Sequence, residues 1–396
     1  MVQTIKKLQK GYIKISETED LTEIELILRD FLRQYNLQVK EHVIVSLLGY
    51  LGQKFNTPYY KIKVFIAYYN SEPYGMVISD LNPEYKSYGR KCGTFGWLLC
   101  QDQQVCDLLL KQCELYVKEN RLRKIRGPIN FPKNEFGFGL QFTGIDEPLL
   151  YGVAPANENP DIYDYLVSLG YIPESEYTCM HVVEESWKKG DSLDSSLKLC
   201  CLPVDEVEEK IDEIVELAGD SFSSLLPDTS GGGRENVEEL LHLATHVSKD
   251  YFHYHQVYDP FERYKHIPEF IEGWKDVDLE EMVTVFPMAL ERKTNRLIGI
   301  LIGVLDYYQC WNNQYVSRIN VHTAMVRKGY NGKGVFSSLN NFGQATNRAM
   351  WGTEYFEGTA IWTRNSKGVN NEDAVNSIFP HCQPNRRHVV FEKRVK

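Results

Sequence analysis

The stretch VHTAMVRKGYNGKGVFSSLNN, residues 321–341, decides how the second half of this chain folds. Its residue pattern predicts a strand over 315–326 and a helix over 335–352, joined by the glycine-rich turn KGYNGKG. A turn of this kind exposes backbone N–H groups at the helix start, where the helix dipole adds positive potential. Gly332 and Gly334 would let a phosphate approach closely. The stretch therefore predicts a phosphate site, and the alternative is a plain tight turn.

The elements around this stretch extend the same α/β pattern over the second half. Helices are predicted over 205–222 and 236–252, and strands over 283–291, 297–308, 356–365 and 388–395. The first half repeats this order, with strands over 12–16, 64–69, 75–81, 93–100, 124–130 and 178–183 and helices over 21–35, 40–54, 102–121 and 159–170. Both halves read β-α-α-β-β-β-α-β-α-β, which indicates a duplicated mixed α/β unit.

The unit boundaries follow from composition. We expect a first unit over 1–183, a polar connection over 184–203 and a second unit over 204–396. Each unit is expected to form its own mixed sheet flanked by helices, and the two are expected to meet near the connection. A length of 396 residues suits two or three domains.

Charge and cysteine usage narrow the class of protein. The net charge of -10 argues against binding nucleic acid through bulk charge, so no nucleic-acid partner is expected. No apolar run approaches the roughly 18 residues of a membrane span, and the N-terminus has no apolar signal core, which predicts a cytoplasmic protein without a membrane partner. The 9 cysteines are odd in number and form no CxxC pair, so they are expected to be reduced and packed as small apolar groups.

These elements and motifs resemble the GNAT superfamily of acyl-CoA N-acyltransferases. In the first half, GTFGWLLC (93–100), the Gly-Pro-Ile-Asn motif (127–130) and NPDIYDYLVSLGY (159–171) are similar to a group of two-domain GNAT-like proteins. The resemblance covers most of 60–180 and 283–396. It implies an α/β (α+β) fold of two GNAT-like domains, each a mostly antiparallel sheet with a splayed parallel pair, flanked by helices.

The resemblance also implies a reaction. The donor would be acetyl-CoA or another acyl-CoA, acting as co-substrate, and the acceptor would be a small-molecule amine or a peptide. The acyl group would pass directly between them in a ternary complex, without a metal. The acidic composition leaves a polyamine, an amino sugar or another cationic acceptor open, and the sequence does not indicate an oligomeric state.

In the family, the pyrophosphate lies on the glycine-rich loop and the pantetheine on the strand before it. The loop pattern is Arg or Gln, two residues, Gly, one residue, then Gly or Ala; here Asn331 and Phe336 depart from it, and Gly334 keeps it. The residues implied to bind the cofactor are Thr323, Met325, Val326, Lys328, Gly329, Tyr330, Asn331, Gly332, Lys333, Gly334, Val335 and Asn365. The first half has no matching glycine loop after 93–100, so we expect no CoA site there.

Proton transfer needs a base near the acyl site, because the attacking amine must be neutral. His322, on the strand that leads to the acyl site, and Asp306, at the end of the preceding strand, are the candidates. Alternation places His322 on one face of the strand and Thr323 on the other. The alternative for His322 is a sheet histidine satisfied by a neighbour. Many family members use a tyrosine as the acid for the thiolate, but none occurs after Thr359; Asn365 and its neighbour stand near that place.

Other candidate sites are weaker. His242 and His246 lie one helical turn apart without the glutamate of an HExxH motif, so no metal site is expected. Glu238 and Glu239 are interpreted as part of a solvated helix face. The segment 127–130 either places asparagines across a splayed sheet or forms a structural turn.

Two hypotheses remain open at this stage. The first is an acyl-CoA-dependent N-acyltransferase with its cofactor in the second half, supported by the order of strand, glycine loop and helix. The second is a non-catalytic GNAT-fold protein that binds a ligand or a partner, supported by Asn331, Phe336 and the missing tyrosine.

Overall fold

The computed structural model describes residues 12–182, 193–221, 226–229, 233–245, 264–275, 286–330, 332–363 and 382–395. Its helices are α1 (Leu21–Phe31), α2 (Leu37–Phe55), α3 (Gln103–Glu119), α4 (Lys133–Phe136), α5 (Ile162–Ser168), α6 (Val204–Glu209), α7 (Ile211–Ser221), α8 (Arg234–Thr245), α10 (Pro268–Trp274), α11 (Tyr307–Trp311) and α12 (Val335–Trp351). Its strands are β1 (Ile13–Thr18), β2 (Ile62–Tyr69), β3 (Glu72–Asp80), β4 (Lys86–Ser87), β5 (Arg90–Lys91), β6 (Gly93–Cys100), β7 (Lys124–Gly127), β8 (Leu140–Thr143), β9 (Ile172–Val182), β10 (Leu197–Cys200), β11 (Met288–Glu291), β12 (Leu297–Leu305), β13 (Arg318–Val326), β14 (Tyr355–Trp362) and β15 (Gln383–Arg394).

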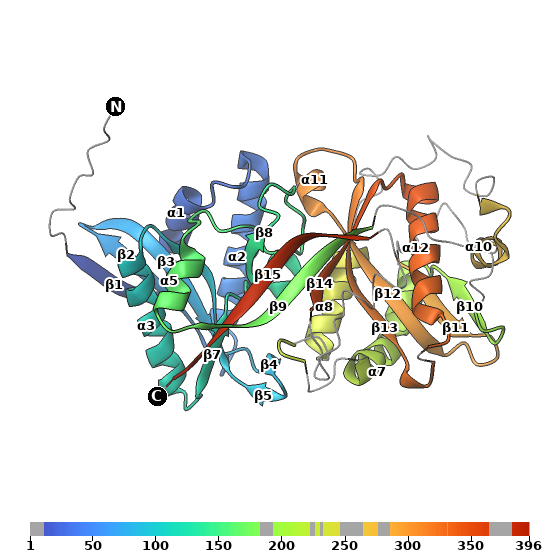
Figure 1. Cartoon of the computed structure of the whole chain (residues 1–396), viewed down its shortest axis with the longest axis horizontal. Helices are drawn as coiled ribbons and strands as arrows, with labels where there is room; N and C mark the ends of the chain where they lie inside the picture. Colours follow the sequence, from blue (N-terminus) through green and yellow to red (C-terminus); the bar gives the residue numbers. More distant parts are fainter. Residues whose placement is uncertain are drawn as a thin grey trace.

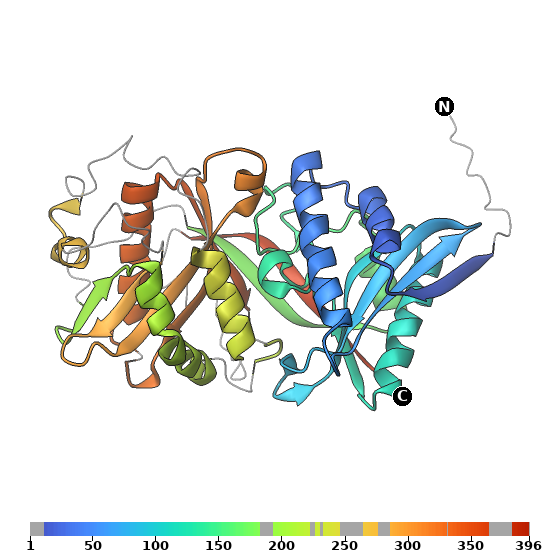
Figure 2. The ribbon, with the colours of Figure 1, turned by 180° about the vertical axis from the view of Figure 1, so that it is seen from behind.

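The strands form a mixed sheet that confirms the expected fold class. Their order is β1-β2-β3-β6-β7-β15-β9-β14-β13-β12-β11-β10, and β8 pairs with β15 outside this path. Two neighbouring pairs in the described sheet are parallel, β6 with β7 and β13 with β14, one in each half. The other pairs are antiparallel, and helices cover the sheet in both halves (Figures 1 and 2).

The expectation of two separate sheets is wrong, because two strands join the halves into one 13-stranded sheet. The last strand, β15, lies between β7 and β9 of the first half, where Phe391 pairs with Gly127 and Val389 pairs with Glu176. The other end of β9 pairs with β14 of the second half. Figure 1 shows β9 and β15 side by side across the middle of the molecule. The unit boundaries expected at residues 183 and 204 stay a prediction. They would assign β15 to the second unit, although its neighbours β7 and β9 belong to the first half.

The connection expected over 184–203 also contains a strand. Residues Leu197–Cys200 form β10, which pairs with β11 at the edge of the sheet. Leu197 and Leu199 are buried and Lys198 lies between them, so the segment has the alternation of a half-buried strand. Four residues inside a polar stretch are too few for that pattern to stand out in the sequence.

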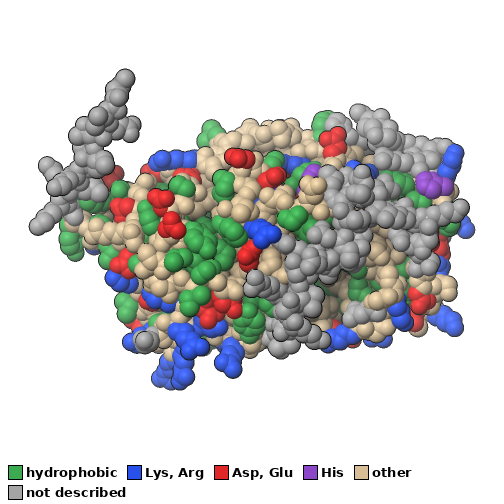
Figure 3. Space-filling model, in the orientation of Figure 1, with side chains coloured by type: hydrophobic (Ala, Val, Ile, Leu, Met, Phe, Trp, Pro, Cys, Tyr) green, Lys and Arg blue, Asp and Glu red, His purple; other side chains and the backbone are tan. Residues whose placement is uncertain are grey.

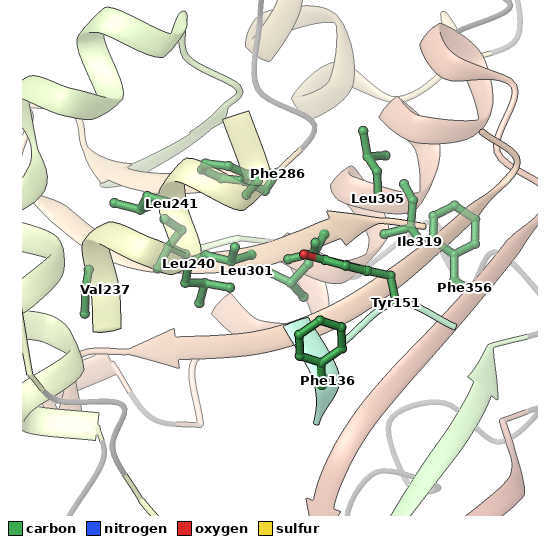
Figure 4. Packing of buried hydrophobic residues seen from close by; sticks show 14 of the residues in the cluster. Phe136, Tyr151, Val237, Leu240, Leu241, Phe286, Leu301, Leu305, Ile319 and Phe356 are labelled. Carbon is green, nitrogen blue, oxygen red and sulfur yellow. The ribbon is translucent and has the colours of Figure 1, made fainter. Parts of the chain in front are cut away.

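One hydrophobic core extends across both halves. Phe136 and Tyr151, from the first half, are buried in the same cluster as Leu240, Leu301 and Ile319 of the second half. Figure 4 shows both aromatic rings among these aliphatic side chains. Burial of one large apolar side chain contributes about 1.5–3 kcal/mol, so the shared cluster favours a fixed arrangement of the halves.

The cysteines, the apolar character of the helices and the surface charges bear on the remaining expectations. All nine cysteines are free and buried, as expected, and they pack as small apolar groups. In the described part of the chain, no helix combines the length and the apolar character that a membrane crossing requires. Acidic and basic side chains are interspersed over the face drawn in Figure 3.

Candidate functional site

The candidate site begins where the parallel strands β13 and β14 separate. They pair from Arg318 with Tyr355 to Val321 with Gly358, and beyond this point β13 continues to Val326 paired with β12. The backbone groups of β13 that face β14 therefore pair with no described strand over the last residues of β13. Such an open edge can offer hydrogen bonds to an extended ligand.

A cavity of about 310 Å³ lies beside this point of separation, and both halves line it. The second half contributes strand residues His322, Thr323, Met325, Ile302, Thr359, Ala360 and Trp362, with Asn236, Val237 and Leu240 from α8. The first half contributes Lys133, Asn134, Phe138, Gly152 and Tyr177. The lining is thus mostly apolar with a few polar groups, as in small-molecule sites.

His322 lies in this cavity at a β-bulge. Ile302 pairs with Thr323 and Gly303 pairs with Val321, so His322 is an extra residue on β13. The bulge brings both His322 and Thr323 to the cavity, and the expected strict alternation is wrong at this point. The Nδ1 atom of His322 is buried without a hydrogen-bond partner among the described residues. Burial, together with the charge of Lys133, lowers the pKa of His322 to about 4, so its ring is neutral at pH 7.

Glu239 is a second ionisable group near the cavity, and its interpretation as part of a solvated helix face is wrong. Glu238 is exposed and pairs with Arg234, but Glu239 is partly buried and its Oε1 has no described hydrogen-bond partner. Burial raises the pKa of Glu239 to about 7; nearby Glu135 adds to the rise, and a hydrogen bond with cavity-lining Asn134 opposes it. Adjacent helix residues point about 100° apart, so two neighbouring glutamates need not share one environment.

Asp306, the other expected base, is occupied elsewhere. Its carboxylate is buried, accepts hydrogen bonds from the backbone N–H groups of Tyr151 and Tyr308 at 3.1 and 3.2 Å, and pairs with Arg318 at 2.5 Å. The Asn320 side chain donates to the carbonyl of Tyr151 at 2.9 Å. Asp306 is not among the residues that line the cavity. Its contacts instead fasten the first half onto the end of β12.

The glycine-rich loop has the local geometry of a helix start. Residues Lys328–Tyr330 form a short 3₁₀ turn, and Gly334 caps α12 in the left-handed region at φ 73°. Gly332 also has a positive φ, 75°, and apart from its chain neighbours no described heavy atom lies within 4 Å of where its Cβ would be. The first N–H groups of an α-helix have no partner within the helix. The open space at Gly332 therefore lies beside the unpaired amides of α12.

The charges of this loop differ in their surroundings. Arg327 is buried, donates to the carbonyl of Leu297 and pairs with Glu216 through both terminal nitrogens at 3.0 and 3.1 Å. Lys328 and Lys333 are exposed, and the ammonium of Lys333 lies 4.7 Å from the ring centre of Tyr330. The two lysines, rather than Arg327, are thus available to a ligand.

The structure brings part of the predicted cofactor set together. Thr323 and Met325 line the cavity, and Val326 pairs with Gly299 at the end of β13. Val335 has a buried side chain at the first position of α12. Asn331 and Asn365 lie outside the described residues, as does His246 of the histidine pair.

The corresponding place in the first half is filled. Strands β6 and β7 separate after Thr94 and Arg126, but the Gly127–Asn130 segment then turns across the gap. Asn130 accepts a hydrogen bond from the backbone N–H of Trp97 at 2.9 Å, and the N–H of Ile129 donates to Phe95. A pocket of only about 50 Å³ remains there. Both interpretations of residues 127–130 thus apply. The segment is a structural turn, and its Asn130 side chain accepts a hydrogen bond from β6 across the gap between the separated strands.

A loop of the second half forms one wall of the cavity and is anchored on the first half. Leu226, Pro227, Asp228 and Thr229 line the cavity. Asp228 is buried and accepts five hydrogen bonds, from Tyr85, from two nitrogens of Arg126, from Ser175 and from Tyr177. The guanidinium and the hydroxyls hold the pKa of Asp228 below its ordinary value despite its burial. Sequence reasoning missed this anchor, because a Pro-Asp pair also marks an ordinary turn.

Among the residues that the structure describes, no group of three His, Cys, Asp or Glu side chains is placed to hold a metal ion. The expectation of a metal-free site stays a prediction.

No family model and no curated protein sequence matches the chain. Solved structures do match over nearly its full length. A tandem GNAT protein from the clavulanic acid biosynthesis pathway, solved without acetyl-CoA, is 10% identical, with 97% of this chain and 99% of that chain covered at a TM-score of 0.50.

Two further matches share this fold. A GCN5-related glucosamine N-acetyltransferase region of a fungal multi-domain GH3 β-N-acetylglucosaminidase is 11% identical at a TM-score of 0.53; 98% of this chain is covered, but only 38% of that chain. A probable N-acyltransferase from Enterococcus faecalis V583 is 8% identical at a TM-score of 0.50, over 97% of this chain and 73% of that one. The chain therefore has the GNAT fold in its tandem form.

Proposed function

We propose that this protein is an acyl-CoA-dependent N-acyltransferase whose acceptor binds in the cavity between the two halves. The observation that carries the proposal is the coincidence of three features on one strand. The open edge of β13, the bulge at His322 and the glycine-capped start of α12 follow one another along the chain. Similar tandem GNAT and N-acetyltransferase structures support this function.

The acyl-CoA would lie along the second half. Its pyrophosphate would contact the amides of Gly332 to Val335, with Lys328 and Lys333 adding positive charge, and its pantetheine would follow the open edge of Thr323–Val326. A backbone N–H at that edge would polarise the thioester carbonyl, an effect worth a few kcal/mol in the transition state. The donor is acetyl-CoA or another acyl-CoA.

The acceptor amine would enter from the cavity and attack the thioester carbon. The neutral ring of His322 would accept a hydrogen bond from the amine and direct its lone pair to the carbonyl. The C–N bond forms, the C–S bond breaks and CoA leaves as the thiolate, while Glu239 takes the proton of the amine through cavity water or Asn134. A base with a pKa near the working pH is the most effective. Burial raises the pKa of both Glu239 and Asp306, to about 7 and about 6. Asp306 does not line the cavity, whereas Glu239 hydrogen-bonds with Asn134, which does, and this favours Glu239.

The test is calorimetry with acetyl-CoA and with longer acyl-CoAs, followed by measurement of CoA release with a panel of amines that includes glucosamine. We expect binding in the micromolar range and acceptor-dependent release. A lack of binding at high micromolar acyl-CoA would rule out the enzyme hypothesis and leave the non-catalytic GNAT-fold alternative, which Asn331 and Phe336 favour.

A further inference from the structure

Lys133 places a positive charge in the cavity, and none of the carboxylates that the structure describes pairs with it. It is the first residue of α4, it is partly buried, and it lines the cavity beside Asn134. Its ammonium lies 5.2 Å from the ring centre of Phe138, a weak cation–π contact. It forms no ion pair with a carboxylate among the described residues. Burial lowers the pKa of Lys133 to about 8, so most of the side chain stays charged at pH 7.

The acidic groups nearest to Lys133 do not supply that missing partner. Both oxygens of Asp228 accept hydrogen bonds from donors of the first half, so Asp228 acts on Lys133 through its charge without pairing with it. Glu239 has a pKa raised to about 7 and is therefore only partly ionised at neutral pH. A half-buried ammonium without a counter-ion is costly in free energy, and a ligand that brings an anion into the cavity would offset this cost.

The phosphates of the donor are not that anion. They would lie at the loop after β13, whereas Lys133 is close enough to His322 to lower the pKa of its ring. Val326 lies four residues after His322 along the strand, a span of about 13 Å at 3.3 Å per residue. The part of acyl-CoA that would approach His322 is the neutral thioester. The free charge of Lys133 therefore faces the acceptor.

From this placement we infer that the acceptor is an amine that also carries an anionic group, a carboxylate or a phosphate, which pairs with Lys133. The inference rests on the proposed function and deepens it. The rest of the acceptor would be mostly apolar, because Val237, Ile302, Met325 and Trp362 line much of the remaining cavity. A polyamine would instead bring a second ammonium next to Lys133, so the cationic acceptors that the composition left open are disfavoured.

The test compares acceptors that differ only in the anion, using the full chain and acetyl-CoA. The pairs are leucine with leucinamide and phosphoethanolamine with ethanolamine, and spermidine is the cationic probe. We expect kcat/KM to be at least about tenfold higher for the anionic member of one pair, mainly through KM; that pair then identifies carboxylate or phosphate. If kcat/KM for leucinamide and for ethanolamine equals or exceeds that of the partner with the anionic group, the inference is overturned, whatever the variants do.

Variants locate the effect. Lys133→Met should abolish the preference for the member that carries the anionic group, whereas Lys133→Arg should keep the preference. Lys111→Met is the matched control, because Lys111 is exposed on α3 and pairs with Asp107. A preference that survives in folded Lys133→Met would also refute the assignment.

Binding measurements can test the anion site even if the proposed acyltransferase activity is not observed. If acetyl-CoA binds but no acceptor is acylated, binding of the same four amines is measured by calorimetry on the wild type and on Lys133→Met. Tighter binding of an anionic member, lost in the variant, supports the anion site even then. Equal binding within each pair refutes it.

Discussion

Replacement of Asp228 by asparagine tests how the cavity wall is held. In the wild type, the side chains of Asp228 and Arg126 are both 0% exposed and their atoms approach to 2.9 Å. Asparagine keeps the shape but turns one acceptor oxygen into an NH₂ group, which then faces donors from Arg126 and the hydroxyls. Removal of one partner of a buried pair costs about 3–5 kcal/mol, a large part of the roughly 5–15 kcal/mol that stabilises a typical protein.

The assay is equilibrium urea unfolding of Asp228→Asn beside Asp212→Asn. Asp212 pairs with Arg234, but its side chain is 83% exposed, so the same substitution there should cost about 0–1 kcal/mol. The folded-state pKa of Asp228 is below its ordinary value, so its contribution is present at neutral pH and is lost as the pH falls through that lowered pKa. The difference between Asp228→Asn and the wild type should therefore shrink below about pH 4. Equal losses from both substitutions at pH 7 would refute the reasoning.

Three further outcomes follow from the site. Gly334→Val should weaken acetyl-CoA binding about tenfold or more in a calorimetric titration, because a branched residue is strained at φ 73° and its side chain would crowd the unpaired amides. The control is Gly219→Ala on α7. Gly219 has open space where a Cβ would be added, so this change should leave the affinity unchanged. Glu239→Gln should remove the rise of kcat with pH through about pH 7 and lower kcat about 10²–10⁴-fold; a wild-type profile that instead rises near pH 4 would assign the base to His322. Asp306→Asn should cost about 3–5 kcal/mol in urea unfolding, since it breaks the buried contact with Arg318, while a lost rise near pH 7 in its rate profile would show that Asp306 is the base after all.

Local patterns predicted the elements around the site well. The strand, the glycine turn and the helix over 315–352 are present because alternation, glycine placement and helical spacing are properties of neighbouring residues. His322 was placed on the correct strand, but the bulge that turns it into the cavity depends on the register with Ile302 and Gly303. Register between strands is not encoded in the spacing of one strand.

The contacts between the halves were beyond such patterns. Segment 388–395 reads as a strand in the sequence, but its apolar residues do not indicate whether β14 or β7 will be its neighbour. Asp228 and Glu239 illustrate the same limit for polar groups. Each lies in a segment that is typical of solvated turns or helix faces. Asp228 is nevertheless buried and Glu239 partly buried, because residues of the other half contact them.

The position of β15 between β7 and β9, together with the pairing of β9 with β14, explains why the candidate site lies between the halves and why the described residues form one such site. Each half has one parallel pair that splays, and a splay exposes backbone that must be paired or offered to a ligand. In the first half, Asn130 and Ile129 pair with that backbone, so the gap is closed by the chain itself. In the second half, β9 and the segment with Lys133 come from the first half and border the gap without filling it. The first half of the chain thus forms a wall of the cavity in the second half, and the charge of Lys133 on this wall faces the place where an acceptor would bind.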